Sequence, residues 1–391
     1  MRTSHRRCGA ACAALICVAL AACGSTRPSG LACNLTKYIE APDKWAPFNL
    51  PLDRELNVLS LSAGGEHGAY GAGLLAGWAQ AGPAKPIHPR DITVVTGVST
   101  GALIATHAYL GRFDDITKIY TSLSGPQIYK ENGLFSLLTS NALTDTSGKD
   151  RIISSLVTKE LIDAVASEAS ARPQRKLLVG AVDLDSGEFL KINLTQLAGD
   201  TSAPNREKCY EAALGAASAI PVVFSPIFVD GRMLVDGGTR HHAFIQTLDT
   251  IYVGVDVKRR LFSIYHGDLR VQKVAVDNGV LPIAKRSSGV VTDQLIKDTA
   301  YRLDYIARLS PANRKFDTYF ADARAASQLC APQRALAECR ASGSANDEDM
   351  FCQPFMKCLA EEGRKEGLRI ATQDTWTRDL PREALGSGLS Q

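Results

Sequence analysis

Ser99 has the sequence surroundings of a catalytic nucleophile. It lies in the pentapeptide GVSTG, residues 97–101, between an apolar run at 92–95 and small apolar residues at 102–105. A strand, a G-x-S-x-G turn and a helix in this order form a nucleophile elbow, which lifts a serine hydroxyl above the edge of a sheet. Side chains at Gly97 or Gly101 would collide with the strand and the helix that close around the turn. The chemistry expected of Ser99 is attack on an acyl carbonyl.

A glycine-rich turn upstream supplies candidate oxyanion donors. Residues 62–69, SAGGEHGA, follow the strand-like segment 56–61. Because a turn that leads into a helix leaves backbone N–H groups unpaired, we expect those of Gly64, Gly65 and Glu66 to stabilise a negative oxygen. The spacing fits neither common phosphate-binding glycine motif. A turn that serves only close strand–helix packing is the second interpretation.

Asp236 is the candidate base. It lies in VDGG, residues 235–238, after a short apolar stretch. A carboxylate at the end of a strand can accept the serine proton directly, and partial burial would raise its ordinary pKa of about 4 toward neutrality. An ordinary Asp-Gly turn is the alternative. A Ser-His-Asp triad would instead need His241, His242 or His266, and none of these resembles the late, loop-borne histidine of an ordinary α/β-hydrolase.

The N-terminus has the composition of a bacterial lipoprotein signal. Three arginines precede an apolar run at 8–22, which is too short to span a bilayer. The run ends in LAAC, which resembles a lipobox, so we expect cleavage before Cys23 and acylation of its thiol. An ordinary secretory signal is the alternative. Because Gly24 stands where an inner-membrane retention aspartate would stand, we expect the outer membrane, facing the periplasm.

Composition narrows the possible partners. The chain has 391 residues with 44 Lys and Arg against 41 Asp and Glu, and loss of the signal with its three arginines leaves 41 of each sign. A balanced chain without a basic run gives little support for nucleic-acid binding. The expected division is a signal peptide at 1–22, a lipidated tether at 23–55, a hydrolase domain at 56–322 and a helical C-terminal extension at 323–391.

Six cysteines remain after export, an even number that predicts disulfides in an oxidising compartment. We expect at least one bridge among the last four, and the spacing leaves the connectivity open. A zinc site lacks a CxxC pair and a nearby histidine, whereas reduced, buried thiols are the other alternative. The six are Cys33, Cys209, Cys330, Cys339, Cys352 and Cys358.

Strand-like and helix-like segments alternate from residue 56 to about residue 256, which predicts an α/β fold with a sheet between helical layers. The stretch 290–309 has apolar residues at helical spacing and is expected to pack on this core. The predicted strands are 56–61, 92–95, 176–182, 188–192 and 251–257, and the predicted helices are 70–80, 100–110, 150–171 and 207–217.

The motifs, in this order, resemble those of the patatin-like phospholipase family over roughly residues 56–260. The glycine-rich block corresponds to residues 64–68, ending at Gly68, and the base motif to Asp236, Gly237 and Gly238. The segment ASAIPVVFSP at 217–226 is similar to the family's ASxAxPxxFxP segment. The resemblance implies a three-layer α/β/α fold with a mostly parallel sheet. It also implies a Ser99–Asp236 dyad that needs no histidine, metal or cofactor.

The activity that the resemblance implies is hydrolysis of membrane-lipid acyl esters through an acyl-enzyme. Two positions depart from the family pattern: Ala63 stands where the loop usually has another glycine, and His67 where it usually has Lys or Arg. Ala63 restricts the turn, and His67 weakens the local positive field unless it is protonated. An apolar trough is expected beside Ser99, with the aromatic residues Trp78, Tyr70 and Phe224 as candidates for its walls or for the core.

A catalytically silent lipoprotein that binds lipid or an envelope partner through the same pocket is the alternative function. The altered glycine loop and the cysteine-bearing C-terminal region motivate it.

Overall fold

The computed structural model describes residues 27–40, 55–82, 86–128, 130–131, 144–145, 147–245, 258–267, 269, 275–309, 315–339 and 351–380. The predicted signal peptide, Cys23, most of the predicted tether, the predicted strand at 251–257 and residues 381–391 lie outside this part of the chain. Within it, no helix combines the length and the apolar composition that a membrane crossing requires.

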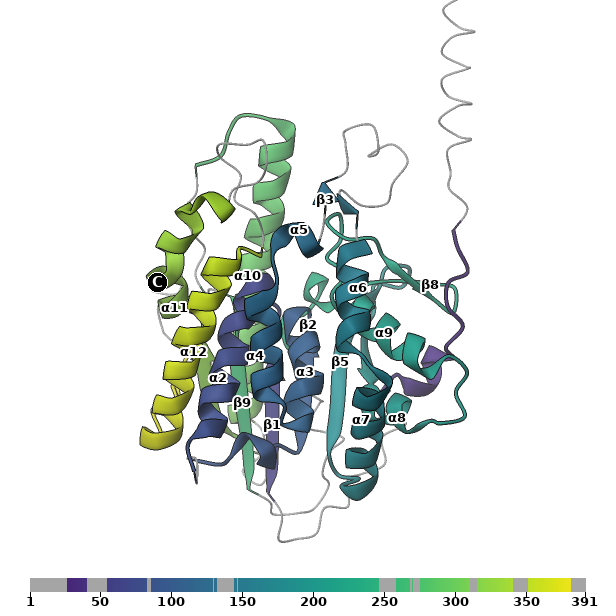
Figure 1. Cartoon of the computed structure of the whole chain (residues 1–391), viewed down its shortest axis with the longest axis horizontal. Coiled ribbons are helices and arrows are strands. Elements are labelled where there is room, and N and C mark those ends of the chain that lie inside the picture. The colour runs from purple at the N-terminus through teal and green to yellow at the C-terminus, as the bar shows by residue number, and fades with distance from the viewer. Residues whose placement is uncertain are drawn as a thin grey trace, which may run out of the picture.

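An eight-stranded mixed sheet forms the centre of the fold (Figure 1), in the order β10-β9-β1-β2-β5-β8-β7, with β6 also paired to β5. Strands β10, β9, β1, β2 and β5 run parallel, whereas β6, β7 and β8 pair antiparallel. The strands are β1 Leu56–Leu61, β2 Val94–Val98, β5 Lys176–Asp183, β6 Phe189–Asn193, β7 Ile227–Val229, β8 Arg232–Asp236, β9 Arg259–Tyr265 and β10 Asp317–Asp322. A separate pair joins β3 Lys130–Glu131 to β4 Thr144–Asp145.

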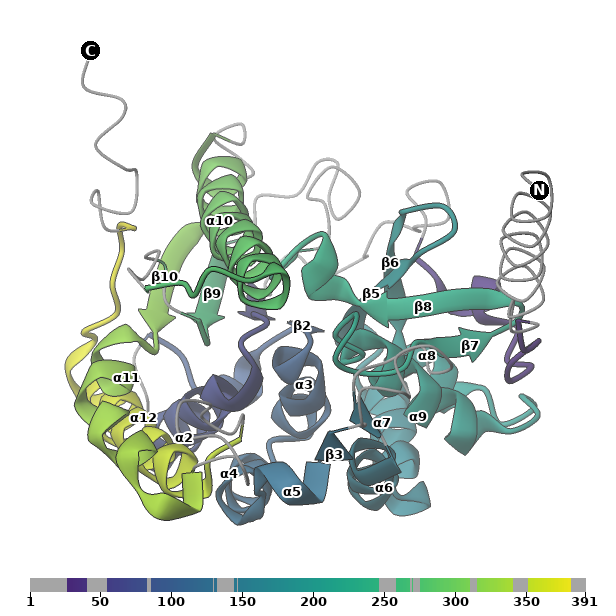
Figure 2. The same ribbon diagram turned by 90° about the horizontal axis from the view of Figure 1, so that it is seen from above.

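Helices cover both faces of the sheet. Figure 2 shows α10 on one face and α2, α3 and α12 on the other, which confirms the expected α/β architecture with a mostly parallel sheet. The α-helices are α2 Gly68–Gln80, α3 Thr100–Leu110, α4 Phe113–Ser122, α5 Gly125–Ile128, α6 Ser147–Leu156, α7 Lys159–Ala171, α8 Leu194–Gly199, α9 Arg206–Ala217, α10 Val280–Leu309, α11 Arg324–Cys330 and α12 Gln353–Gln373. Short 3₁₀ turns include η2 Gly65–His67, η5 Gly237–Thr239 and η7 Ala331–Ala335.

Strand β1 shows why the sheet is buried on both faces. Its side chains alternate between two apolar clusters: Leu59 and Leu61 join the cluster under α2, α3 and α12, whereas Leu56 and Val58 join the cluster under α10. Because successive side chains of a strand point to opposite faces, a strand between two helical layers contributes apolar side chains to both clusters.

The observed helices and strands differ from the predicted ones in several places. Residues 150–171 do not form one helix, because α6 ends at Leu156 and the hydroxyl of Thr158 caps α7 by accepting the N–H of Leu161 at 3.3 Å. The predicted strand at 92–95 is displaced, since β2 spans Val94–Val98. Strand β10 was absent from the prediction, and it extends the sheet by parallel pairing with β9.

Helix α12 packs closely along α2 through glycines. A Cβ on Gly73 would overlap the carbonyl of Ala360, and a Cβ on Gly367 would overlap the carbonyl of Leu74. Gly77 and Gly363 make equivalent contacts with the opposite helix. The small residues thus let the two helix backbones approach each other, and the C-terminal region shares the apolar cluster of α2 and α3.

Three disulfides tie the fold together. Cys33 joins Cys209, and two bridges, Cys330–Cys358 and Cys339–Cys352, lie in the C-terminal region. The prediction of at least one bridge among the last four cysteines is therefore confirmed. Zinc and reduced thiols are wrong for these six residues, because all six are paired with one another.

Gly→Ala substitutions inside and outside the α2–α12 contact should have opposite effects on stability. Alanine normally favours a helix over glycine by about 1 kcal/mol. Gly289→Ala in α10 should therefore raise the melting temperature, because among the described residues no atom beyond its own stretch of helix lies within 4 Å of the added Cβ. Gly367→Ala should instead lower the free energy of unfolding by about 1–3 kcal/mol, because the helices must separate. Thermal and urea unfolding would measure both, and stabilisation by Gly367→Ala would contradict the close packing.

Candidate active site

Ser99 lies at a sharp turn between β2 and α3. It has φ 55° and ψ −125°, a strained backbone for a residue with a side chain, and it is 5% exposed. A Cβ on Gly97 would overlap the carbonyl of Gly101, and a Cβ on Gly101 would overlap the carbonyl of Leu61. The turn therefore closes as tightly as its two glycines predict, with Ser99 at its tip.

Asp236 is the last residue of β8, and it is 3% exposed. Its Oδ1 accepts the N–H of Gly238 at 2.7 Å. Burial raises the pKa of Asp236 to about 6, and the Ser99 hydroxyl, the Gly238 N–H and the charge of Lys149 partly oppose that rise. Oδ2 accepts no hydrogen bond of ordinary geometry from the described residues, although the Ser99 hydroxyl is near enough to favour the charged form. The carboxylate of Asp236 is therefore close enough to Ser99 to accept its proton.

The pairing of β5 brings the two side chains together. Strand β6 pairs with residues 178–182 of β5. Within that stretch, residues 178–180 also pair with β2, and residues 181 and 182 also pair with β8. Because a strand has two edges, β2 and β8 must share the edge that β6 leaves open. Val98 lies opposite Gly180, and Asp236 lies opposite the next residue, Ala181. Ser99 and Asp236 therefore meet where β2 ends and β8 arrives.

The end of α9 fixes both backbones. The carbonyl of Ala217 accepts the N–H of Ser99 at 2.9 Å, and the carbonyl of Ala219 accepts the N–H of Asp236 at 2.9 Å. Residues 217–219 begin the ASAIPVVFSP segment, which the sequence singled out by resemblance alone. Their physical role is to fix the distance between Ser99 and Asp236, because both backbone hydrogen bonds end on carbonyls of this one turn.

The glycine loop follows β1 directly, beside the end of β2. Leu61 lies opposite Gly97, so the parallel register places residues 62–67 next to the elbow. Within the described residues, the N–H groups of Gly64, Gly65 and Glu66 donate to no backbone carbonyl outside η2. Gly65 and Ser99 line the same pocket. Unpaired N–H groups next to a nucleophile suit a developing negative oxygen.

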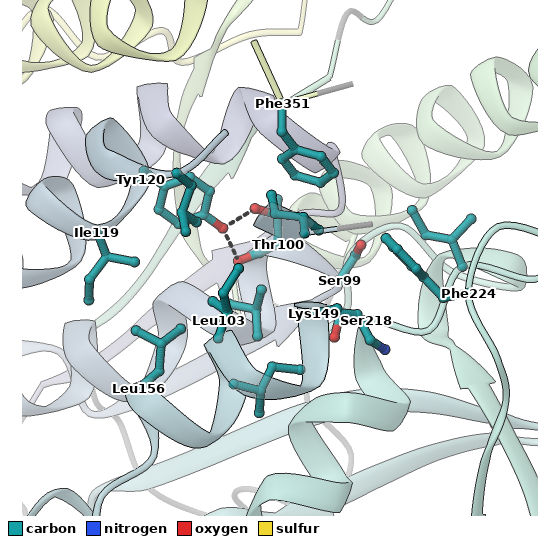
Figure 3. Close-up of a pocket in the computed structure, with 16 residues that line it drawn as sticks. Ser99, Thr100, Leu103, Ile119, Tyr120, Lys149, Leu156, Ser218, Phe224 and Phe351 are labelled. Atoms are coloured by element: carbon teal, nitrogen blue, oxygen red, sulfur yellow. Dashed lines mark hydrogen bonds between the residues drawn. The ribbon is translucent and has the colours of Figure 1, made fainter. Parts of the chain in front are cut away.

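An apolar pocket opens beside Ser99 (Figure 3). Leu103, Ile119, Leu156, Phe224 and Phe351 surround it, and the Tyr120 hydroxyl bonds to Thr100 at its wall. The remaining lining residues are Gly65, Leu123, Ile128, Lys149, Ile152, Ile153, Ser218 and Ile220. Such a lining suits a hydrocarbon chain more than a polar ligand.

Of the three aromatic residues predicted for the trough, only Phe224 lines this pocket. Trp78 and Tyr70 belong to the core: the indole N–H of Trp78 donates to the carbonyl of Ile87 at 2.9 Å, and Tyr70 is 4% exposed. Apart from Phe224, the sequence analysis assigned no side chain to the wall of this pocket, and Lys149 and Phe351 are among those it missed. Lys149 begins an i, i+3, i+4, i+7 series on α6 that faces the pocket, a periodic signal available in the sequence. Phe351 follows no such pattern.

The histidines do not complete a triad. None of His241, His242 and His266 lines the pocket that contains Ser99. Burial lowers the pKa of all three to about 4, so they are neutral at pH 7. The ring of His266 is fixed under the glycine loop, with Nδ1 2.6 Å from the carbonyl oxygen of Ser62. The ring of His67, in the glycine loop, contacts the C-terminal region through Ser327 at 3.1 Å.

Burial of Asp236 predicts a more stable Asp236→Asn variant. The folded pKa of about 6 lies above the ordinary value of 3.8, so native stability is lost as pH rises from about 4 through 6. The full loss is about 3 kcal/mol. Above pH 7 the asparagine variant should therefore melt at a higher temperature than the native protein, and below pH 4 the difference should vanish.

Melting temperatures measured from pH 4 to pH 8 check this, with Asp298→Asn on the exposed side of α10 as the control. An Asp236→Asn effect that does not change with pH would contradict the shifted pKa.

Comparison with known proteins bears on this site. The family described as patatin-like phospholipase matches residues 59–249, a segment that contains the glycine loop, Ser99 and Asp236. Among solved structures, the chain is similar to VipD from Legionella pneumophila, with 12% sequence identity and a TM-score of 0.36 over 89% of this chain and 72% of that chain. Comparison with curated proteins gives no match.

Proposed function

We propose that this chain, whose residues 59–249 match the patatin-like phospholipase family, is a serine acyl hydrolase that cleaves membrane-lipid esters through Ser99 and Asp236. The observation that carries the proposal is the proximity of a buried aspartate to a strained serine that lines an apolar pocket. Lipid acyl hydrolysis is the activity that the family implies. The dyad and the substrate are our inference.

In the first half-reaction, the Ser99 oxygen attacks the ester carbonyl while Asp236 takes the hydroxyl proton. The carbonyl oxygen becomes an anion, which the N–H groups of Gly64, Gly65 and Glu66 stabilise. Asp236 then passes the proton to the departing alcohol oxygen, and the C–O bond breaks. The fatty acyl group is left as an ester on Ser99.

In the second half-reaction, Asp236 accepts a proton from water, and the water oxygen attacks the acyl carbonyl. Collapse of this intermediate releases the fatty acid and returns the proton to Ser99. A pKa of about 6 supports this role, because the carboxylate is ionised at pH 7 and is a stronger base than an exposed aspartate. The positive charge of Lys149 favours that ionised form.

The lining of the pocket supports a fatty acyl chain as the part of the substrate that is bound. Leu103, Ile153 and Leu156 form a hydrocarbon wall, with Phe224 and Phe351 also lining the pocket. Burying each methylene of an acyl chain against such walls contributes about 0.8 kcal/mol. Longer acyl chains should therefore bind more tightly until the pocket is full.

The hydrolase proposal is tested by removing each member of the dyad. Ser99→Ala and Asp236→Ala should each lower fatty-acid release from a panel of purified phospholipids and neutral lipids about 10³-fold or more, without loss of the folded circular-dichroism spectrum. Ser186→Ala and Asp185→Ala in the exposed turn after β5 are matched controls and should keep activity. Near-normal turnover by Asp236→Ala would show that the dyad is wrongly assigned.

Labelling with a fluorophosphonate separates the two functions that the sequence left open. An activated serine reacts with this probe, so a hydrolase should be labelled at Ser99 and the Ser99→Ala variant should not be. Folded native protein that resists labelling and releases no fatty acid from any lipid would favour the silent lipid-binding lipoprotein.

We also propose that acylated Cys23 anchors the chain to the bacterial outer membrane, facing the periplasm. The LAAC sequence and Gly24 support this. Mass spectrometry of the mature N-terminal peptide should find diacylglyceryl-modified Cys23, and Cys23→Ala should leave the membrane fraction of an expressing bacterium. Cleavage elsewhere with an unmodified Cys23 would favour an ordinary secretory signal.

A further inference from the structure

The carboxylate of Glu66, in the middle of the glycine loop, is bound by the C-terminal region. It forms an ion pair with Arg334, and its Oε2 accepts the N–H groups of Phe351 at 3.0 Å and Cys352 at 3.1 Å. Its side chain is 9% exposed. Both carboxylate oxygens are thus satisfied by residues that lie more than 260 positions away in the sequence.

The groups that bind Glu66 are themselves held in place. Cys352 is bridged to Cys339, and the guanidinium of Arg334 lies 3.9 Å from the ring centre of Phe355 in α12. We call Arg334, Phe351, Cys352 and the Cys339–Cys352 disulfide the C-terminal clamp. Because α12 packs tightly on α2, the clamp is connected to the core on which the glycine loop rests.

The next residue of the loop is held from the same side. The Nε2 of His67 lies 3.1 Å from the hydroxyl oxygen of Ser327, and its ring meets the ring of Phe355 edge-on at 5.4 Å. Gly64 and Gly65 carry no side chain that could restrain the loop, and a glycine backbone has wide conformational freedom. The backbone at the start of the loop is held by the bond from the Ala63 N–H to the carbonyl of His242 at 2.7 Å and by the close packing of Gly64 on His266. The side chains of Glu66 and His67 add the restraint that comes from the C-terminal region.

The clamp also reaches the pocket. The ring of Phe351 lines the pocket beside Ser99 (Figure 3). Its backbone is left-handed, with φ 68°, and its N–H binds Glu66. One residue of the clamp therefore touches both the expected acyl site and the loop that supplies the oxyanion donors.

We propose that Glu66 is a positioning residue, and that the disulfide-bonded C-terminal clamp holds the glycine loop so that its N–H groups face the developing oxyanion. This proposal rests on the hydrolase function proposed above. It gives the C-terminal region a part in turnover, and it makes activity dependent on oxidation of Cys339 and Cys352.

The first test compares Glu66→Gln with the native protein. Glutamine keeps the shape and an acceptor for the two N–H groups, and it loses the charge that Arg334 binds. With p-nitrophenyl butyrate as substrate, we expect kcat to fall about 10- to 100-fold with KM nearly unchanged, because oxyanion stabilisation acts on the transition state. The rate of fluorophosphonate labelling at Ser99 should fall in parallel.

The second test uses a double-mutant cycle. If Arg334 acts on turnover through Glu66, then Arg334→Gln and Glu66→Gln should lower kcat by similar factors, and the double variant should lose no more than either alone. A merely stabilising contact would lower the melting temperature and leave the kcat of the folded fraction intact.

The third test compares two disulfides in the full chain. Cys339→Ala/Cys352→Ala should lower kcat by at least as much as Glu66→Gln. Cys33→Ala/Cys209→Ala, which removes the bridge between the N-terminal segment and α9, should keep kcat within about twofold at a temperature where both variants are folded.

The outcomes separate this proposal from the hydrolase proposal. If native protein neither hydrolyses esters nor labels at Ser99, both fall. If native protein is active and Glu66→Gln keeps its kcat within twofold, only the clamp proposal is overturned. Equal loss of kcat in the two disulfide variants would also overturn it, because it would trace the effect to general stability.

Discussion

Strands β2 and β8 pair with the same edge of β5, and the geometry of the site depends on this shared edge. Strand β2 brings Ser99 to the end of a parallel pair, where β1 also ends and the glycine loop begins. Strand β8 approaches from the opposite direction and delivers Asp236 to the next position along β5. A parallel sheet gathers loops at its carboxyl edge, and the antiparallel strand adds a carboxylate to that edge without a further crossover.

Ser99 and Asp236 are both held in states that reduce the stability of the fold. Ser99 has a strained backbone, and Asp236 is a buried carboxyl group with a raised pKa. Such features persist when the surrounding structure over-determines them. The carbonyls of Ala217 and Ala219 do so here, since each accepts the backbone N–H of one of the two residues. Stability is thus given up at the residues to which we assign the chemistry.

The C-terminal region belongs to the same packed body as the sheet. Glycines on α2 and α12 let the two helices touch, and two disulfides fasten the segment that binds Glu66. Disulfides form in oxidising compartments, which agrees with the export that the N-terminal sequence predicts. A region that the sequence indicates as a helical extension therefore contacts the loop that carries the proposed oxyanion donors.

By itself, the sequence determined the features that have local causes. The elbow at Ser99 follows from a strand, two glycines and a helix placed side by side, and the chain order of the motifs indicated Asp236 as its partner. Only the tertiary structure decided that β8 runs antiparallel on β5, that Phe351 lines the pocket, and that Glu66 is bound by Arg334. These contacts join residues far apart in the chain. Strand pairing and the burial of a charge depend on which residues the rest of the fold places opposite them. The pattern of apolar residues within a single segment does not indicate those partners.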